Sequence, residues 1–149
     1  MLADPELNPS AVELGRFLPW PRDDVWRALT EPDLLEQWLM RPTGFVVAVG
    51  THFVFAVPSP SPGEIACEVL AVRPGERLLV SWVDSRADQP DPWVLDWTLG
   101  AQGRGTRFLL TQTGFDIDDR RQRMARNALE RGWKTSLGRL SEVLDSADG

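Results

Sequence analysis

The sequence is poor in the residues on which many catalytic and disulfide-bonded proteins depend. Its 149 residues include one cysteine, Cys67, one histidine, His52, and no tyrosine. A single cysteine excludes an intramolecular disulfide, and a reducing compartment is therefore permitted, so we expect a cytoplasmic protein. No run of about 18 apolar residues is present, which argues against a membrane-spanning helix and a membrane partner. Residues 1–10 are acidic and contain proline, which is not the pattern of a signal peptide.

The charge balance argues against nucleic-acid binding. The formal net charge is −6 and the sequence pI is about 4.8, whereas domains that bind a phosphate backbone usually carry a basic excess. Apolar residues make up 42% of the chain and charged residues 26%, as in ordinary globular proteins. At this length we expect a single domain over residues 1–149, with a core at about 12–145 and flexible tails at 1–11 and 146–149.

The N-terminal third predicts one strand followed by two short helices. Residues 12–18 predict a strand that ends at Pro19 and Pro21, because proline cannot continue a ladder of hydrogen bonds. Pro21 and the acidic residues that follow it suit the first turn of a helix. A second short helix follows, with Thr30 as its N-terminal cap and Pro42 at its end.

The middle of the chain predicts a succession of antiparallel strands joined by turns rich in glycine and proline. Apolar residues alternate with other residues in two of these strands. One strand places Leu78, Val80 and Trp82 on one face, and another does the same with Trp93, Leu95, Trp97 and Leu99. One face of the sheet is therefore strongly apolar. The predicted strands are 45–49, 51–57, 64–72, 77–83, 93–99 and 104–113.

The C-terminal region predicts the longest helix, capped by Asp118 and running to about Ser146. Its arginine-rich side is interpreted as a solvated face. Its apolar stripe can pack on the apolar face of the sheet, which gives an α+β fold. The stripe comprises Met124, Ala128, Trp133, Leu137, Leu140 and Leu144.

Several short motifs in order along residues 12–145 add a family resemblance. They are Pro21-x-x-x-Val25-Trp26-x-x-Leu29-Thr30-x-Pro32, Trp38, Gly50 with Phe53 and Phe55, Val69-Leu70-x-Val72-x-Pro74-x-Glu76-Arg77-Leu78, Trp82, Gly105-Thr106 with Phe108 and Leu110, Gly114-Phe115, and Gly132-Trp133 with Leu137 and Leu140. With these motifs the chain resembles the activator of heat-shock protein ATPase homologue family, in the START-like, Bet v 1-like (SRPBCC) superfamily.

The resemblance implies a helix-grip fold, in which a curved antiparallel sheet wraps around a long C-terminal helix over a cavity. The superfamily includes lipid and hormone binders, polyketide cyclases and co-chaperone domains, so the resemblance implies the fold more than the function. Two positions depart from the family pattern. Gln112 stands where relatives often have histidine, and Cys67 stands where a small residue is usual, so chemistry based on that histidine is not carried over.

The candidates for catalysis have simpler interpretations. The parity of His52 places it away from the apolar side, and a lone Cys67 in a strand usually packs as a small apolar group. One histidine and one cysteine cannot form a tetrahedral metal site. The acids at 84, 88 and 91 lie in or beside a proline-rich loop, and the parity of Asp96 places it outward. No catalytic residue, metal or cofactor is therefore assigned.

Aromatic residues are the remaining candidates for a site. Their ordinary role is to fill the core, but a sheet bent around one helix leaves room for an apolar pocket with a few polar groups. Gln112 shares the inward parity of its apolar neighbours and is a candidate polar contact. The candidate ligand-binding residues are Trp38, Phe53, Phe55, Trp82, Trp93, Trp97, Phe108, Gln112, Phe115, Trp133 and Leu137.

Three functions are compatible with these patterns. The first is a binding protein for a small apolar or amphipathic molecule, monomeric or homodimeric. The second, implied by the family name, is a co-chaperone-like regulator of a heat-shock ATPase that uses a surface such as the arginine-rich helix face to bind an acidic protein partner. The third is a polyketide cyclase-like or hydrolase-like enzyme that orients a substrate in the cavity.

Overall fold

The computed structural model describes residues 10–58, 62–87 and 92–148. Over these residues the elements follow the order expected for a helix-grip fold. They are β1 (Val12–Leu18), α1 (Arg22–Thr30), α2 (Pro32–Trp38), β2 (Pro42–Thr43), β3 (His52–Val57), β4 (Gly63–Arg73), β5 (Arg77–Asp84), β6 (Trp93–Gln102), β7 (Gly105–Thr113) and α3 (Arg120–Asp148).

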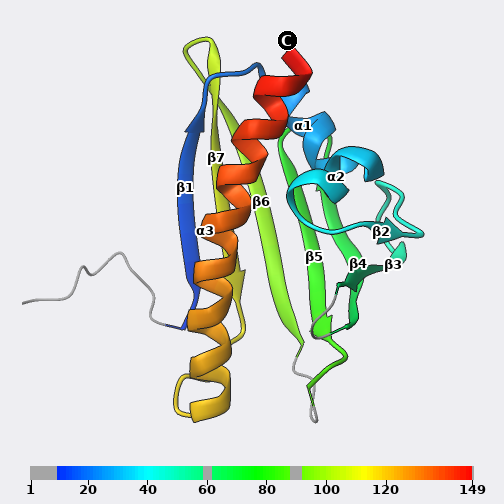
Figure 1. Ribbon diagram of the computed structural model, residues 1–149, viewed down its shortest axis with the longest axis vertical. Coiled ribbons are helices and arrows are strands. Elements are labelled where there is room, and N and C mark those ends of the chain that lie inside the picture. The colour runs from blue at the N-terminus through cyan, green and yellow to red at the C-terminus, as the bar shows by residue number, and fades with distance from the viewer. Residues whose placement is uncertain (1–9, 59–61, 88–91, 149) are drawn as a thin grey trace, which may run out of the picture.

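The strands form a seven-stranded antiparallel sheet in the order β1-β7-β6-β5-β4-β3-β2. β1 and β2 are therefore the two edge strands, and β7, the last strand along the chain, lies beside β1, the first. Figure 1 shows α3 crossing one face of the curved sheet, with α1 and α2 near its C-terminal part. The register shift in β4 between Val69 and Ala71 is a bulge of the kind that bends a strand and adds to the curvature of a sheet.

Cross-strand pairs confirm the predicted alternation. Leu78 lies opposite Trp97, and Trp82 lies opposite Trp93, and all four side chains are buried against the helix layer. The residues between them, such as Asp96, face the opposite side of the sheet, where Arg77 donates two hydrogen bonds to the Asp96 carboxylate at 3.0 and 2.8 Å. The period of two therefore separates an apolar face from a polar one, as the sequence predicted.

The two short helices are held on the sheet by buried contacts. In α2, the indole N–H of Trp38 donates to the backbone carbonyl of Ala28 in α1 at 2.8 Å, with both residues fully buried. The prediction that Thr30 caps α2 is wrong. Its hydroxyl donates back to the carbonyl of Trp26 at 2.8 Å, and Glu31 occupies the cap position. α2 ends at Trp38, and Pro42 begins β2.

The predicted strand at 45–49 is also wrong. Gly44 and Gly50 on either side of it have φ of +81° and +90°, which turns the chain at both ends. Between them, local hydrogen bonds from Ala48 N to Val46 O and from Thr51 N to Ala48 O replace a ladder. Val46 and Val49 are exposed, so the apolar composition that suggested a strand does not mark burial here.

The long helix begins one residue later than predicted and runs past Ser146 to Asp148. Asp119, rather than Asp118, accepts the backbone N–H of Arg121 at 2.9 Å. Four residues of the predicted stripe are buried, but Met124, at 59% exposed, and Ala128 both lie exposed. Most of the predicted N-terminal tail, the last residue of the C-terminal tail, and positions 88 and 91 lie outside the described residues.

Candidate functional site

A cavity of about 460 Å³ lies between the first part of α3 and strands β3, β4, β5 and β6. The segment after α2 and the residues just after β5 complete its wall. Exposed residues lie on this wall as well as buried ones, so the cavity opens to solvent. Its lining residues are Leu39, Met40, Val57, Ile65, Trp82, Asp84, Arg86, Ala87, Trp93, Arg121, Gln122, Ala125, Ala128, Leu129, Gly132, Trp133 and Ser136.

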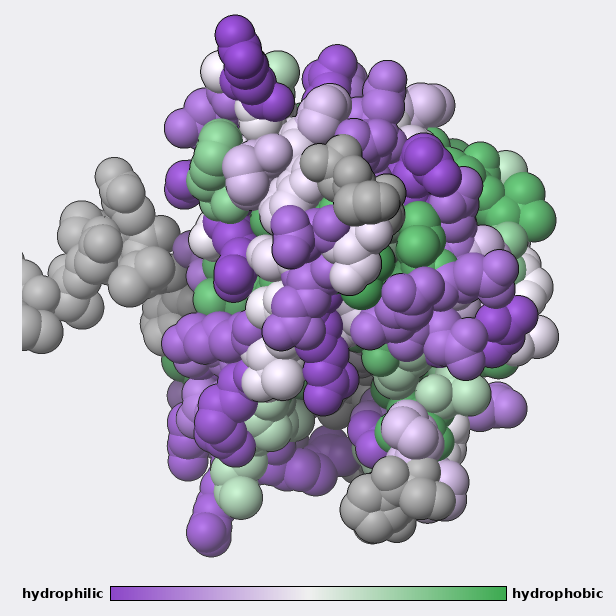
Figure 2. Space-filling view, turned by 45° about the horizontal axis from the view of Figure 1, so that its top comes forward, coloured by the Kyte–Doolittle hydropathy of each residue, from purple (hydrophilic) through white to green (hydrophobic). Residues whose placement is uncertain are grey.

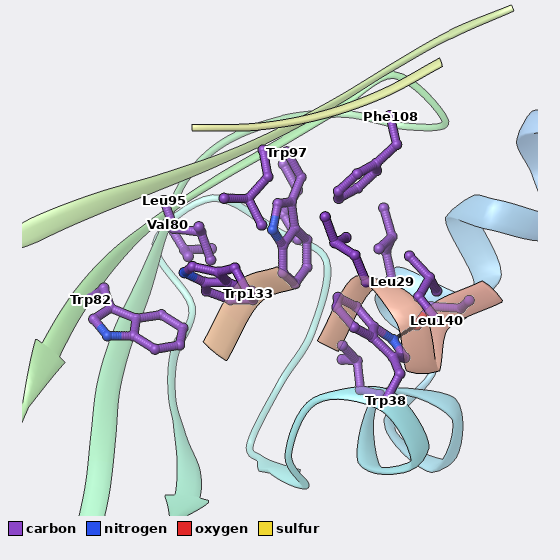
Figure 3. Packing of buried hydrophobic residues seen from close by; sticks show 14 of the residues in the cluster. Leu29, Trp38, Val80, Trp82, Leu95, Trp97, Phe108, Trp133 and Leu140 are labelled. Carbon is purple, nitrogen blue, oxygen red and sulfur yellow. Dashed lines mark hydrogen bonds between the residues drawn. The ribbon is translucent and has the colours of Figure 1, made fainter. Parts of the chain in front are cut away.

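Trp133 and Trp82 form the deep aromatic wall of the cavity. The Trp133 ring, from α3, lies 5.4 Å from the Trp82 ring of β5 and 6.4 Å from the Trp97 ring of β6, between centroids. Figure 3 shows these rings in a row, with Trp133 between Trp82 and Trp97 and with Trp38 beyond. Tilted and edge-to-face arrangements of this kind are favourable for aromatic pairs. The cavity therefore borders directly on the aromatic core.

A buried hydrogen bond fixes the orientation of Trp133. Its indole N–H donates to Oε1 of Gln112 in β7 at 2.8 Å, and Gln112 is fully buried. The oxygen of the amide is thereby used, and its nitrogen, Nε2, has no acceptor among the described residues. Gln112 thus holds in place the Trp133 ring, which lines the cavity.

Charged groups lie at the mouth of the cavity. Arg86 donates to the Asp84 carboxylate through Nε at 2.9 Å and through Nη2 at 2.6 Å, and the Arg86 backbone N–H adds a third bond at 2.9 Å. Hydrogen bonding from Arg86 lowers the pKa of the Asp84 carboxyl below its ordinary value. Arg121, on the first turn of α3, also borders the mouth and pairs with Asp119 at 3.7 Å. Figure 2 shows one face of the molecule, which is mainly hydrophilic, with apolar side chains visible in patches.

Gln122 supplies a polar group inside the cavity. It is 8% exposed, and its Oε1 accepts the backbone N–H of Asp116 at 2.8 Å. Because this bond assigns the oxygen, the amide nitrogen is the end left for other partners.

Of the residues proposed from the sequence as ligand-binding, three line the cavity, namely Trp82, Trp93 and Trp133. The others are buried in the core and do not border this cavity. These are Trp38, Phe53, Phe55, Trp97, Phe108, Gln112, Phe115 and Leu137. Direct contact of any of these side chains with a ligand stays a prediction.

Sequence reasoning missed most of the remaining wall. Leu39 was placed at helical spacing only as part of a short helix, Met40 follows that helix, and Val57 and Ile65 flank a proline-rich turn, so none of them was marked as a cavity residue. Gln122 follows a run of charged residues and carried no visible signal. The available signal for the α3 wall was helical spacing, because Leu129 and Ala125 lie four and eight residues before Trp133 on the same side of the helix.

The other candidates for chemistry lie away from the cavity. His52 is exposed, with Nε2 3.8 Å from the Glu68 carboxylate. Cys67 is buried, and burial raises the pKa of its thiol to about 12, which makes it a poor nucleophile. Within residues 10–58, 62–87 and 92–148, no three His, Cys, Asp or Glu side chains gather closely enough to hold a metal ion. No helix in this part of the chain combines the length and apolar character needed to cross a membrane.

Comparison with known proteins places the chain in a family. The model of the family described as Activator of Hsp90 ATPase homolog 1-like protein matches residues 19–145. Protein MLL2253 from Mesorhizobium loti has a similar structure, with 34% identity, a TM-score of 0.82, and coverage of 91% of this chain and 97% of that one. No curated protein sequence is significantly similar.

More distant structures share the fold. Protein NE0264 from Nitrosomonas europaea is 22% identical with a TM-score of 0.78, and the match covers 97% of this chain and 99% of the other. DynU16, a protein of the dynemicin biosynthetic locus, is 23% identical with a TM-score of 0.77, and the match covers 93% of this chain and 48% of DynU16.

Proposed function

This chain belongs to the Activator of Hsp90 ATPase homolog 1-like family, and we propose that it binds a small apolar or amphipathic molecule in the cavity beneath α3. The observation that carries the proposal is the volume of about 460 Å³ behind walls that include Trp82, Trp93 and Trp133. Small-molecule sites have volumes of this order, apolar aromatic walls and a few polar groups that orient the ligand. The charged mouth and Gln122 provide such polar groups.

A glycine in α3 supports this interpretation. Gly132 lies on the cavity wall, and a Cβ placed there would meet no atom within 4 Å. Glycine within a helix costs roughly 0.5–1 kcal/mol relative to alanine. Steric crowding does not explain this glycine, since there is room for a side chain. The lack of a side chain at Gly132 leaves volume for a ligand next to Trp133.

The enzyme alternative has less support from the cavity wall. Among the described lining residues, the one carboxylate is Asp84, and its pKa is lowered by the hydrogen bonds from Arg86. A general base works best with a pKa near the operating pH, and this shift moves Asp84 away from it. The wall therefore favours binding over proton transfer.

The surface-regulator alternative is also weakened, because two arginines of the basic face of α3 are engaged within the protein. Arg126 donates through Nε to the carbonyl of Ala11 at 3.0 Å and pairs with Glu130 at 3.2 Å. Arg123 donates to the carbonyl of Ile117 at 2.7 Å. Reversal of either charge would disturb the fold as well as any partner.

The proposal is tested by filling the cavity from α3. Gly132→Leu adds a side chain to the wall, and the matched control is Gly138→Leu on the same helix, where a Cβ also meets no atom within 4 Å but no cavity is lined. We expect wild type and Gly138→Leu to bind the fluorescent probe anilinonaphthalene sulfonate with similar affinity, and Gly132→Leu to bind at least tenfold more weakly. Thermal unfolding checks that both variants are folded.

Equal affinity of all three proteins for the probe, or absence of binding to wild type, would contradict the proposal. Native mass spectrometry of protein purified from its own host provides an independent test. We expect a small apolar compound bound to wild type and lost from Gly132→Leu.

A further inference from the structure

The charged groups of the cavity are gathered at one end of it. Along α3 the wall begins at Arg121 and Gln122 and ends at Ser136, about 22 Å further along the helix axis. Figure 1 shows that α3 begins at the end of the molecule where β5 finishes, so Asp84 and Arg86 belong to the same end of the cavity. The α3 residues between the two ends of the wall are apolar, namely Ala125, Ala128, Leu129, Gly132 and Trp133.

The charges at this end favour an anion. The described lining residues include two guanidinium groups, those of Arg86 and Arg121, and one carboxylate, that of Asp84. Asp84 accepts three hydrogen bonds from Arg86, so these two charges offset each other. The Arg121 side chain is 47% exposed and lies 3.7 Å from the carboxylate of Asp119. A guanidinium has five N–H donors, so Arg121 can bind an anion of the ligand in addition to its contacts within the protein.

Gln122, the next residue along the chain, adds a donor that opens into the cavity. It is 8% exposed, and its Oε1 accepts the backbone N–H of Asp116 at 2.8 Å. Its Nε2 donates to none of the described residues, yet it is not shut off from solvent as Nε2 of Gln112 is. Because Gln122 lines the cavity, this accessible N–H group is available to a ligand seated there.

We propose that the ligand of the cavity is an amphipathic anion, whose carboxylate or similar head group binds Arg121 and Gln122 while its apolar body packs against Leu129 and Trp133. This inference rests on the proposed binding function. The net charge of −6 makes the protein as a whole repel anions, so a preference for an anionic ligand has to come from groups at the site. Hydrogen bonds from a guanidinium to a carboxylate are of the strong, charge-assisted kind.

Decanoate, decylammonium and decanol test the inference, because they share one alkyl chain and differ in the charge of the head group. Burial of the chain alone favours the neutral decanol, since a charged head group is costly to desolvate. The net charge of the protein alone favours decylammonium over decanoate. We expect the opposite order for the two ions, with decanoate bound about tenfold more tightly than decylammonium in a calorimetric titration near neutral pH.

Arg121→Gln removes the proposed partner of the head group, and Arg120→Gln is the matched control. Both change the net charge equally in the first turn of α3, but Arg120 does not line the cavity. Because Arg121 is half-exposed, we expect its replacement to weaken decanoate binding about three- to fivefold and the control to weaken it less than twofold. Decanol affinity should stay unchanged in both variants. Equal effects of the two substitutions on decanoate would overturn the assignment of Arg121.

The salt dependence of wild type tests the inference without any variant. Raising the ionic strength from about 20 mM to about 300 mM screens both the attraction of a nearby arginine and the repulsion by the whole protein. Attraction to Arg121 predicts that decanoate binds more weakly at high salt, relative to decanol, whereas repulsion by the net charge predicts that it binds more tightly. We expect weaker binding, and tighter binding at high salt would overturn the inference.

The outcomes separate the two proposals. If decylammonium and decanol bind wild type as tightly as decanoate does, the inference of an anionic ligand is overturned and the binding function stands. If none of the three compounds binds, and anilinonaphthalene sulfonate also fails to bind, the proposed function is overturned and the inference with it.

Discussion

The indole N–H of Trp133 donates to Oε1 of Gln112 at 2.8 Å and so joins α3 to β7 inside the core. The two residues are 21 positions apart in sequence, and both are buried. Trp133 also borders the cavity and contacts the Trp82 ring at 5.4 Å. The hydrogen bond therefore determines which side of the Trp133 indole ring lines the cavity.

This pair predicts unequal costs of substitution. Trp133→Phe leaves Oε1 of Gln112 unpaired in addition to Nε2, so we expect a loss of about 2–3 kcal/mol in the free energy of unfolding. Gln112→Leu leaves the indole N–H of Trp133 without an acceptor, but it also removes the unpaired Nε2. Its cost in the free energy of unfolding should therefore be smaller than that of Trp133→Phe. Urea denaturation of the two variants and the double variant should give a coupling of about 1 kcal/mol. Additive effects in this cycle would contradict the assigned bond.

The two open glycines of α3 predict a gain in stability. Gly132→Ala and Gly138→Ala each add a methyl group where no atom lies within 4 Å. We expect each to raise the free energy of unfolding by about 0.5–1 kcal/mol, because alanine favours the helix and restricts the unfolded chain. Urea denaturation measures the gain. Gly105→Ala is the contrasting variant, since a Cβ there would lie 2.6 Å from the carbonyl oxygen of Leu18, and it should destabilise the protein.

Cys67 predicts a pH dependence on the alkaline side. Burial raises the pKa of its thiol from 9.0 to about 12, so the native state resists the charged thiolate. The folded pKa is above the unfolded one, so the stabilising contribution is complete below about pH 9 and is lost as pH rises towards 12. With no tyrosine and one lysine in the chain, few other groups titrate in this interval.

We therefore expect the free energy of unfolding to fall between these pH values in wild type and to fall less in Cys67→Ala. Alkylation by iodoacetamide at pH 8 should be slow in the native protein and fast in urea. Rapid native alkylation would contradict the burial of the thiol.

Asp84 predicts an acid-side effect that depends on Arg86. The Arg86 hydrogen bonds lower the pKa of the Asp84 carboxyl from its ordinary 3.8, so the contribution to stability is present above that pH. It is lost as pH falls through the lower folded value. We expect Arg86→Gln to move the NMR titration midpoint of the Asp84 carboxyl upward. Arg22→Gln, whose arginine pairs with Glu76, should leave it unchanged; a shift of similar size in both variants would refute the pairing.

Much of the fold could be predicted from the sequence because its local patterns are strong. Alternation in β5 and β6 predicted the buried face that includes Trp82 and Trp97, and β1 has the predicted bounds. Predictions failed where one local signal was read alone. The valines at 46 and 49 suggested a strand, and Met124 suggested part of an apolar stripe, but all three are exposed.

The sequence by itself determined the elements, the inward parity of the aromatic residues and of Gln112, and the family resemblance, because these follow from periodicity and short motifs along the chain. Only the tertiary structure decided which inward residues fill the core and which border the cavity. That division depends on where α3 crosses the curved sheet, which brings Trp133 beside Trp82 and leaves space next to Gly132. It also decided that the indole N–H of Trp133 meets Oε1 of Gln112, because hydrogen-bond partners far apart in sequence meet only after folding.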